Sequence, residues 1–266
     1  MNDITPRPVV LCLGGHDPSG GAGILADAES IAAAGAFAVT VITALTDQDT
    51  CGLRHLYPQP PDQVAAQCRA LIHDSAPLVL KIGLIGHAWL VETICELCDA
   101  DTTRLVIFDP VLATGAGQAV ADAALVQQLR EKLIPRCTLI TPNLPEARTL
   151  TGAQTPDDCA SRLLALGTGW VLITGTHDDT AQVTNRLYGA DGTTHAWDWP
   201  RLPGEYHGSG CTLASAIAGQ LASGMALPEA VAAAQIDTWN SLQRAFRSGR
   251  CQLTPNRLYR LEAMTP

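Results

Sequence analysis

Short, continuously apolar segments recur along the first two thirds of the chain, separated by longer segments of mixed polarity. Strands that are buried on both faces of a sheet are apolar throughout, whereas half-exposed strands alternate apolar and polar residues. The apolar runs therefore predict strands of a parallel sheet that is covered by helices on both sides. These runs are Val9–Leu13, Ala38–Ala44, Leu78–Ile82, Leu105–Phe108, Thr138–Thr141 and Trp170–Thr174.

The intervening segments are rich in alanine, and their apolar residues recur at spacings of three and four. This period is typical of amphipathic helices that pack one face on a core. The predicted helices cover residues 21–34, 61–74, 88–99, 119–133 and 156–166. Strands that alternate with helices in this way indicate a doubly wound α/β fold.

The pattern changes after residue 175. Gln182–Tyr188 and Thr193–Trp199 flank a glycine-containing turn, which predicts a β-hairpin at the edge of the sheet. Two helices are predicted to follow, near 210–223 and 227–247. We expect one α/β domain over residues 1–266, with a mostly parallel sheet, an edge hairpin and a C-terminal helical pair. In such sheets ligands bind beyond the carboxyl ends of the strands.

Composition narrows the class of protein. Hydrophobic residues make up 47% of the 266 residues, and the formal net charge is −9. A globular, acidic protein is expected, one that binds neither nucleic acid nor membranes. No apolar stretch is long enough for a membrane span or an export signal, so a cytoplasmic location and nine reduced cysteines are expected. Cys95 and Cys98 have metal-ligand spacing without a second pair, which predicts two partly buried thiols.

A glycine cluster precedes the first C-terminal helix, at Gly208, Ser209, Gly210 and Cys211. Free N–H groups at a helix start, together with the helix dipole, attract phosphate. The same field is expected to lower the pKa of the Cys211 thiol. The glycines can equally have a purely structural role, as the turn that separates two elements. No Gly-Lys pair occurs, which excludes a P-loop, and only two lysines are present, Lys81 and Lys132.

Three further loops follow predicted strands. The first is glycine-rich, from Gly14 into a helix that carries Asp27. The second places Asp109 directly after a strand, and the third contains Asn143 and Glu146. Carboxylate and amide oxygens are ligands that Mg²⁺ prefers. Each also has an ordinary structural interpretation, Asp27 as a helix-dipole partner and Asn143 as the N-cap of a helix near 145–151.

In combination these motifs resemble the hydroxymethylpyrimidine/phosphomethylpyrimidine kinases, which belong to the ribokinase-like superfamily. The resemblance covers nearly the whole chain, in order. It rests on the segments Asp17–Gly23, Val41–Leu45, Lys81–Gly83, Asp109–Val111, Thr141–Glu146 and Gly208–Thr212. It implies ATP-dependent phosphorylation of 4-amino-5-hydroxymethyl-2-methylpyrimidine, and then of its monophosphate, in thiamine biosynthesis. Mg²⁺ as cofactor and a homodimer are implied as well.

The resemblance also implies residue roles. Residues matching the pyrimidine pocket are Gly15, Asp27, Gln48 and Val111. Gly208, Ser209 and Gly210 match the anion hole over the transferred phosphoryl group, and Cys211 matches the catalytic position, as a general base or as a positioning group. Residues matching the ATP and phosphate region are Asp109, Asn143, Glu146 and Thr174, with Asp109 and Glu146 near the metal.

Two departures from the family pattern bear on the substrate. Residues 173–177 lack the lysine that the family often carries there, and Asp49 stands where asparagine is common. Both changes make a phosphorylated substrate less favourable if these side chains face it. The alternatives are a pyridoxal or pyridoxine kinase, a kinase acting on both vitamins, and a non-catalytic sensor that binds the pyrimidine.

Overall fold

The computed structural model describes residues 7–115, 117–176 and 180–262. Its nine strands form one sheet in the order β3-β2-β1-β4-β5-β6-β7-β8-β9. Six strands run parallel to one another: β2, β1, β4, β5, β6 and β7. The other three, β3, β8 and β9, are antiparallel to their neighbours. The strands are β1 (Val9–His16), β2 (Phe37–Asp49), β3 (Gly52–Pro58), β4 (Val79–Ile82), β5 (Leu105–Phe108), β6 (Leu139–Ile140), β7 (Trp170–Ile173), β8 (Gln182–Gly189) and β9 (Thr194–Pro200).

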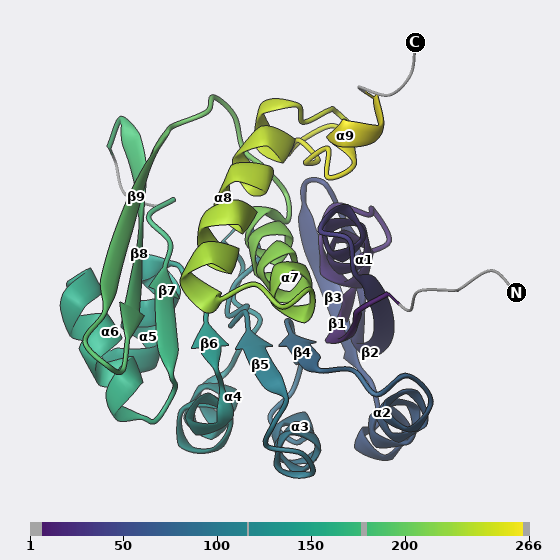
Figure 1. Ribbon diagram of the computed structural model, residues 1–266. Coiled ribbons are helices and arrows are strands. Elements are labelled where there is room, and N and C mark those ends of the chain that lie inside the picture. Colours follow the sequence, from purple (N-terminus) through teal and green to yellow (C-terminus); the bar gives the residue numbers. More distant parts are fainter. Residues whose placement is uncertain (1–6, 116, 177–179, 263–266) are drawn as a thin grey trace, which may run out of the picture.

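Helices cover both faces of the sheet (Figure 1). One face carries α2 (Pro61–Ser75), α3 (Leu90–Asp99), α4 (Ala123–Gln128), α5 (Leu144–Thr151) and α6 (Pro156–Ala165). The other face carries α1 (Gly23–Ala33), α7 (Ser209–Ala222) and α8 (Leu227–Gln243). A short helix, α9 (Tyr259–Glu262), lies near the C-terminus. No helix in the described ranges is both long and apolar enough to cross a membrane. The α/β class with a mostly parallel sheet is thus confirmed.

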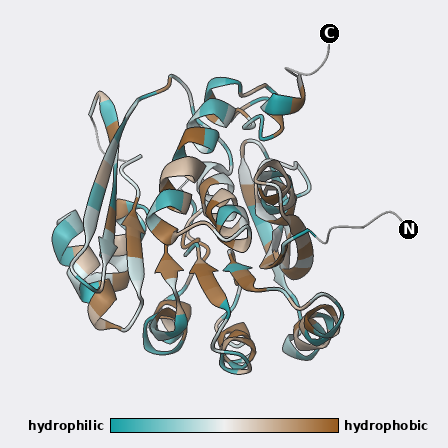
Figure 2. Cartoon of the chain, in the orientation of Figure 1, coloured by the Kyte–Doolittle hydropathy of each residue, from teal (hydrophilic) through white to brown (hydrophobic). Residues whose placement is uncertain are grey.

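Successive residues of the central strands enter two separate cores. In β1, Leu11 and Leu13 pack with α2 and α3, while Val10 and Cys12 pack with α1 and α7. This alternation explains why the central strands are mainly apolar, as the brown colour of β5 and β6 in Figure 2 shows. Because the strands are parallel, their carboxyl ends and the loops after them gather at one edge of the sheet.

Several element boundaries differ from the predictions. β1 continues to His16, so Gly14 and Gly15 lie in a strand and not in the glycine loop. The predicted helix 119–133 begins at Ala123, because the Asp122 side chain caps it by accepting the Leu125 N–H, and it ends in a π-helical turn. The predicted hairpin near the C-terminal third is present as β8 and β9.

A second hairpin was not predicted. β2 runs five residues beyond Ala44, to Asp49, and turns back as β3 at the sheet edge. β3 has no fully buried residue, so it lacks the apolar signal on which the prediction relied. Gln48, which follows the predicted strand Ala38–Ala44, therefore lies near the tip of this hairpin.

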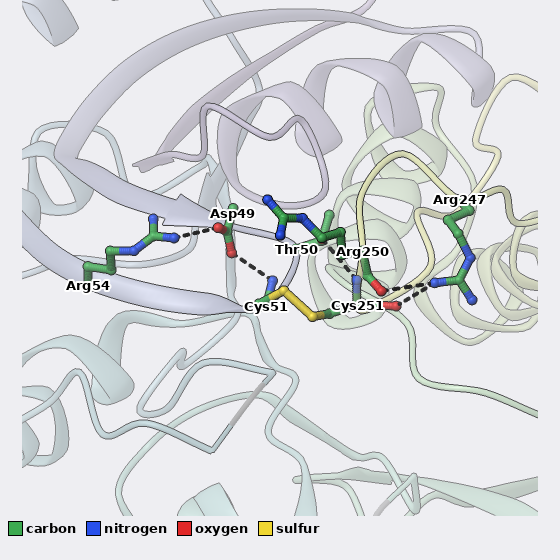
Figure 3. The surroundings of a disulfide bond; sticks show 7 residues. All are labelled: Asp49, Thr50, Cys51, Arg54, Arg247, Arg250 and Cys251. Atoms are coloured by element: carbon green, nitrogen blue, oxygen red, sulfur yellow. Dashed lines mark hydrogen bonds and ion pairs between the residues drawn. A yellow bond between two sulfur atoms is a disulfide. The ribbon is translucent and has the colours of Figure 1, made fainter.

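The prediction of nine reduced cysteines is wrong for one pair. Cys51, in the turn between β2 and β3, forms a disulfide with Cys251 near the C-terminus, 200 residues later in the sequence (Figure 3). The other seven cysteines are free, and Cys95 and Cys98 are both buried. The pairing was not predictable because β3 was missed and because nothing in the sequence indicates where the C-terminal segment folds back.

Thiol titration tests this pairing. In denaturant, protein purified without reductant is expected to react with a chromogenic disulfide reagent at seven thiols, and the reduced protein at nine. A count of nine without prior reduction would contradict the disulfide.

Candidate active site

A single cleft of 810 Å³ opens at the carboxyl edge of the parallel strands. All twelve residues that the sequence analysis assigned to the site line it, although they come from seven separate segments of the chain. They are Gly15, Asp27, Gln48, Asp109, Val111, Asn143, Glu146, Thr174, Gly208, Ser209, Gly210 and Cys211. The cleft therefore brings together the predicted pyrimidine and phosphate residues, whose individual roles remain predictions.

The glycine cluster forms the N-terminus of α7, as predicted. Gly208 is the N-cap, with a left-handed φ of 77°, and it contributes no side-chain hydrogen bond. The first backbone hydrogen bond of the helix runs from Thr212 N–H to the Gly208 carbonyl. The first residues of this 14-residue helix line the cleft, and the N–H groups before Thr212 have no partner within the helix. An anion is therefore favoured at this end of the cleft.

A buried hydrogen bond between two side chains holds this loop against the N-terminal glycine loop. His207 Nε2 lies 2.7 Å from Asp17 Oδ2, and both side chains are buried. The same Asp17 carboxylate oxygen accepts the Ala22 N–H at 2.8 Å. Burial opposes the ionised form of Asp17, but the hydrogen bonds from His207 and Ser19 together outweigh it, so the Asp17 pKa is lowered. The sequence pattern contained both residues but gave no sign that they pair.

Arg257, close to the C-terminus, reinforces the contact between these two glycine loops. Its guanidinium is buried and donates to the carbonyls of Gly20 and Gly21 and to Thr212 Oγ1. Two glycine-rich loops almost 200 residues apart in sequence are thereby fixed relative to one another. Arg257 was missed because it lies outside every motif that the sequence analysis considered.

Asp27 lies on α1 and is fully buried. Its Oδ1 accepts hydrogen bonds at 2.7 Å from Lys81 Nζ and at 2.7 Å from Ser215 Oγ, while Oδ2 has no partner in the described part of the chain. Lys81 is 1% exposed. Burial alone would lower the Lys81 pKa, but the interactions with Asp27 and with the other acidic groups around it, Asp109 among them, together outweigh burial and raise it. Lys81 thus forms a buried ion pair with Asp27, which the sequence analysis did not predict.

Asp109 directly follows β5 and extends its pairing with β4 through a hydrogen bond from Asp109 N–H to the Ile82 carbonyl. Its side chain hydrogen-bonds the Cys211 thiol and Thr141, and Oδ2 is buried with no partner among the described residues. Burial, together with the charge of Asp27, raises the Asp109 pKa against the opposing effect of Lys81. A carboxylate that is buried and only partly satisfied beside an anion-binding helix start is suited to a cation or a proton.

Glu146 and Asn143 form a capping box at the start of α5. Asn143 Oδ1 accepts the Glu146 N–H at 2.9 Å, and Glu146 Oε2 accepts the Asn143 N–H at 3.0 Å. The structural interpretation of Asn143 as an N-cap is therefore confirmed. Burial, with a contribution from the charge of Asp109, raises the pKa of Glu146 to about 8. Two neighbouring acidic groups that are both hard to ionise indicate a place where a cation would relieve the repulsion.

The predicted low pKa of Cys211 is wrong. Cys211 lies in the first turn of α7, as expected, but burial raises its thiol pKa to about 12 against the lowering effect of Lys81, and the charges of Asp109 and Asp27 raise it further. The helix field is thus outweighed by desolvation and by two nearby carboxylates, neither of which the local sequence could show.

The two departures from the family pattern occupy different environments. Asp49 is not among the described cleft residues, and its carboxylate lies 2.5 Å from Arg54 NH2 on the hairpin. Thr174 does line the cleft, bridged to Asn143, while His177 lies outside the described residues. Repulsion of a phosphorylated substrate by Asp49 is accordingly not supported by the geometry.

Comparison with known proteins agrees with this geometry. A family model described as phosphomethylpyrimidine kinase matches residues 17–256. The chain belongs to this family. The kinase is 36% identical over 255 residues to the hydroxymethylpyrimidine/phosphomethylpyrimidine kinase of Streptomyces coelicolor, with 92% of each chain covered. It is 35% identical to the Mycobacterium tuberculosis enzyme of that name, covering 97% of this chain and 96% of the relative.

Solved structures place the kinase in the same fold. A phosphomethylpyrimidine kinase from Clostridium difficile superposes with a TM-score of 0.76 at 31% identity, covering 86% of this chain and 97% of that one. The pyridoxal kinase of Bacillus subtilis, solved with ADP, superposes with a TM-score of 0.86 at 27% identity, covering 96% and 100%. The protein is a phosphotransferase of the ribokinase-like fold, and ATP is the co-substrate of such kinases.

The raised pKa of Glu146 predicts a pH effect on the metal-free kinase. The folded protein keeps a proton on Glu146 up to about pH 8, whereas the unfolded chain releases it near 4.5, the ordinary pKa of glutamate. The stabilising contribution is therefore present at low pH and is lost as the pH rises through this window, by on the order of 1 kcal/mol per pH unit.

Urea unfolding at pH 5.5 and 7.5, in the presence of a chelator, checks this. The Glu146→Gln variant is expected to lose less stability than wild type on going to pH 7.5, because its side chain does not titrate. Equal pH dependence in the two proteins would contradict the prediction.

Proposed function

We propose that this kinase transfers the γ-phosphoryl group of ATP to the hydroxymethyl group of 4-amino-5-hydroxymethyl-2-methylpyrimidine, and then phosphorylates the monophosphate to the diphosphate. The supporting observation is that the α7 N-terminus, Asp109, Asp27 and Gln48 line the same cleft. Its volume of 810 Å³ suits a nucleotide together with a small heteroaromatic alcohol.

The donor set supports Mg²⁺ as the cofactor. Mg²⁺ in kinases is commonly held by one or two carboxylates, by waters and by substrate phosphates. Asp109 Oδ2 is a buried acceptor with no described partner, and Glu146 lies close enough for Asp109 to raise its pKa. No cluster of three or more acidic, histidine or cysteine ligands exists within the described ranges, so ATP and water would complete the shell. The ion would neutralise charge on the transferred phosphoryl group.

Asp27 and Gln48 are proposed to bind the aminopyrimidine, with Gly15 and Val111 as walls of its pocket. Asp27 Oδ1 is already occupied by Lys81 and Ser215, which leaves Oδ2 as the oxygen for a ligand amino group. On the phosphate side, the N–H groups at Gly208, Ser209 and Gly210 stabilise the transferred group. The enzyme is proposed to act as a single domain, as a homodimer, in the cytoplasm.

Cys211 is proposed to position the substrate hydroxyl as a neutral thiol. With its pKa raised to about 12, very little thiolate exists at neutral pH. We therefore expect Cys211→Ser to keep kcat within about threefold of wild type. A general base usually contributes about 100-fold or more, so a loss of that size would assign this role to Cys211 instead.

One substrate assay separates the candidate functions. Purified protein with ATP and Mg²⁺ is offered the hydroxymethylpyrimidine, its monophosphate and pyridoxine separately, and products are followed by mass and by ³¹P NMR. Diphosphate formed from the monophosphate supports the proposal and shows that Thr174 is no obstacle. Turnover of pyridoxine alone would favour a vitamin B6 kinase, a candidate that the similarity to the Bacillus subtilis pyridoxal kinase supports. Binding of the pyrimidine without transfer from ATP would favour a sensor.

A further inference from the structure

The disulfide lies at the rim of the cleft, where it joins two segments that are distant in sequence. Cys51 belongs to the turn of the β2–β3 hairpin, and Cys251 belongs to the C-terminal segment between α8 and α9 (Figure 3). Gln48 and Leu53 of the hairpin and Gln252 of the C-terminal segment all line the cleft. The covalent bond therefore connects two walls of the substrate site directly.

Only a few non-covalent bonds accompany the disulfide at this contact. The Thr50 carbonyl accepts the Gln252 N–H at 3.1 Å, and Thr50 Oγ1 accepts the Cys251 N–H at 3.3 Å. A Cβ added to Gly249 would lie 2.3 Å from Thr50 Oγ1, so the two segments are in close contact. The hairpin tip itself is exposed at Cys51, and β3 has no fully buried residue to anchor it.

The C-terminal segment continues to the anion-binding loop. The Leu253 carbonyl accepts the His207 N–H at 2.9 Å, and Leu253 N–H donates to the Glu205 carbonyl at 2.8 Å. Because His207 immediately precedes the Gly208 N-cap, the disulfide links the hairpin to a segment whose other end is fixed to the phosphate side. The phosphate loop also has its own supports, in Asp17 and Arg257. The hairpin tip depends mainly on the contact around Cys51, with one further hydrogen bond from Leu53 N–H to Gln118 Oε1 at 2.9 Å.

We propose that the Cys51–Cys251 disulfide is a positioning clamp for the pyrimidine site, which holds the hairpin so that Gln48 stays against the bound ring. The proposal rests on the proposed function for the role of Gln48. Reduction by a dithiol breaks the S–S bond, adds two electrons and two protons to give two cysteine thiols, and converts the dithiol to its disulfide. The tip of the hairpin is then held only by the Thr50 hydrogen bonds and by the hydrogen bond from Leu53 N–H to Gln118 Oε1, and affinity for the pyrimidine falls.

The expected signature is a split between kinetic constants. Reduction raises KM for the pyrimidine by about 5- to 50-fold, the range of a typical coupling between sites. The KM for ATP and the value of kcat stay within about twofold, because the α7 N-terminus and Asp109 keep their own supports. Loss of general stability alone would lower all activity together and would not single out one substrate.

The test compares oxidised wild type, wild type reduced with dithiothreitol, and the double variant Cys51→Ser/Cys251→Ser. The reduced protein and the double variant are expected to share the raised KM, and dithiothreitol is expected to have no effect on the double variant. Reoxidation of wild type restores the low KM. If the double variant does not fold, the reduced and reoxidised wild type carry the comparison. An unchanged pyrimidine KM on reduction overturns the proposal.

Hydrogen exchange separates failure of the clamp from failure of the proposed function. Amides of residues 49–53 are expected to exchange at least tenfold faster after reduction, whichever substrate the enzyme uses. If oxidised enzyme phosphorylates no pyrimidine, the proposed function fails, while this readout still reports on the clamp. Unchanged exchange in the hairpin after verified reduction overturns the clamp by itself.

Discussion

Replacing Asp109 with asparagine is expected to lower kcat by about 100-fold or more while leaving the protein as stable as wild type, or slightly more stable. The carboxylate is buried and has an oxygen without a described partner, and its pKa is raised by burial. Asparagine keeps the shape of the side chain but removes the ionisable group. Folding therefore no longer includes the free-energy cost of transferring an acid from water to the interior. The chemistry, however, loses the group best placed to hold a cation or accept a proton beside Cys211.

Steady-state kinetics and urea unfolding of the same preparations measure both halves of this prediction. Asp74→Asn, a change of the same chemistry at an exposed position on α2, serves as the matched control and should alter neither quantity. If Asp109→Asn retained kcat within tenfold, the essential carboxylate would have to be sought elsewhere, with Glu146 as the next candidate.

Substituting alanine for Gly208 is expected to reduce kcat by about 100- to 1000-fold, the usual loss when anion-hole donors are displaced. Gly208 has a φ of 77°, and an added Cβ would lie 2.1 Å from the Gly21 carbonyl oxygen. That oxygen is backbone and is also held by Arg257, so it cannot move away easily. The loop must shift instead, which takes the first N–H groups of α7 away from the phosphoryl group.

Gly224→Ala provides the matched control for Gly208→Ala. Gly224 follows the other end of α7 with a φ of 87°, but a Cβ there would have no neighbour within 4 Å. Alanine at position 224 therefore destabilises the left-handed backbone conformation by about 1 kcal/mol, as alanine at 208 does, but without the steric clash. We expect normal kcat in this variant. Similar losses in both variants would mean that backbone strain, and not displacement of the anion hole, explains the effect.

The central sheet was predictable because its strands carry their signal locally. The residues of β4 and β5 face one of two cores, so both strands appear in the sequence as apolar runs, with Lys81 of β4 as the one polar residue. The capping of α5 by Asn143 was equally local, since the partner Glu146 is three residues away. β3 carried no such signal: Arg54 and His55 are exposed on it, and it is held mainly by pairing with β2.

Contacts between residues distant in the sequence could not be predicted, for a different reason. Lys81 and Asp27 are 54 residues apart and meet only because β4 faces α1 and α7. Burial raises the pKa of Cys211, and the charges of Lys81, Asp109 and Asp27 modify it, whereas the helix-dipole argument alone predicted the wrong direction. The loops were found because glycine and acidic residues follow strands, whereas the electrostatic balance among their side chains depends on the assembled fold.

The Cys51–Cys251 bond gives the folded chain the topology of a large ring with two arms. The ring spans a sequence separation of 200 residues and contains every strand from β3 to β9, while β1 and β2 belong to the N-terminal arm. A cut in any surface loop inside the ring leaves both pieces covalently joined. A cut in the arm between α1 and β2 would instead leave β1, paired with both β2 and β4, attached by non-covalent contacts alone. The oxidised enzyme is thus tolerant of backbone cleavage over most of its length and sensitive to it in the arm that supplies a central strand.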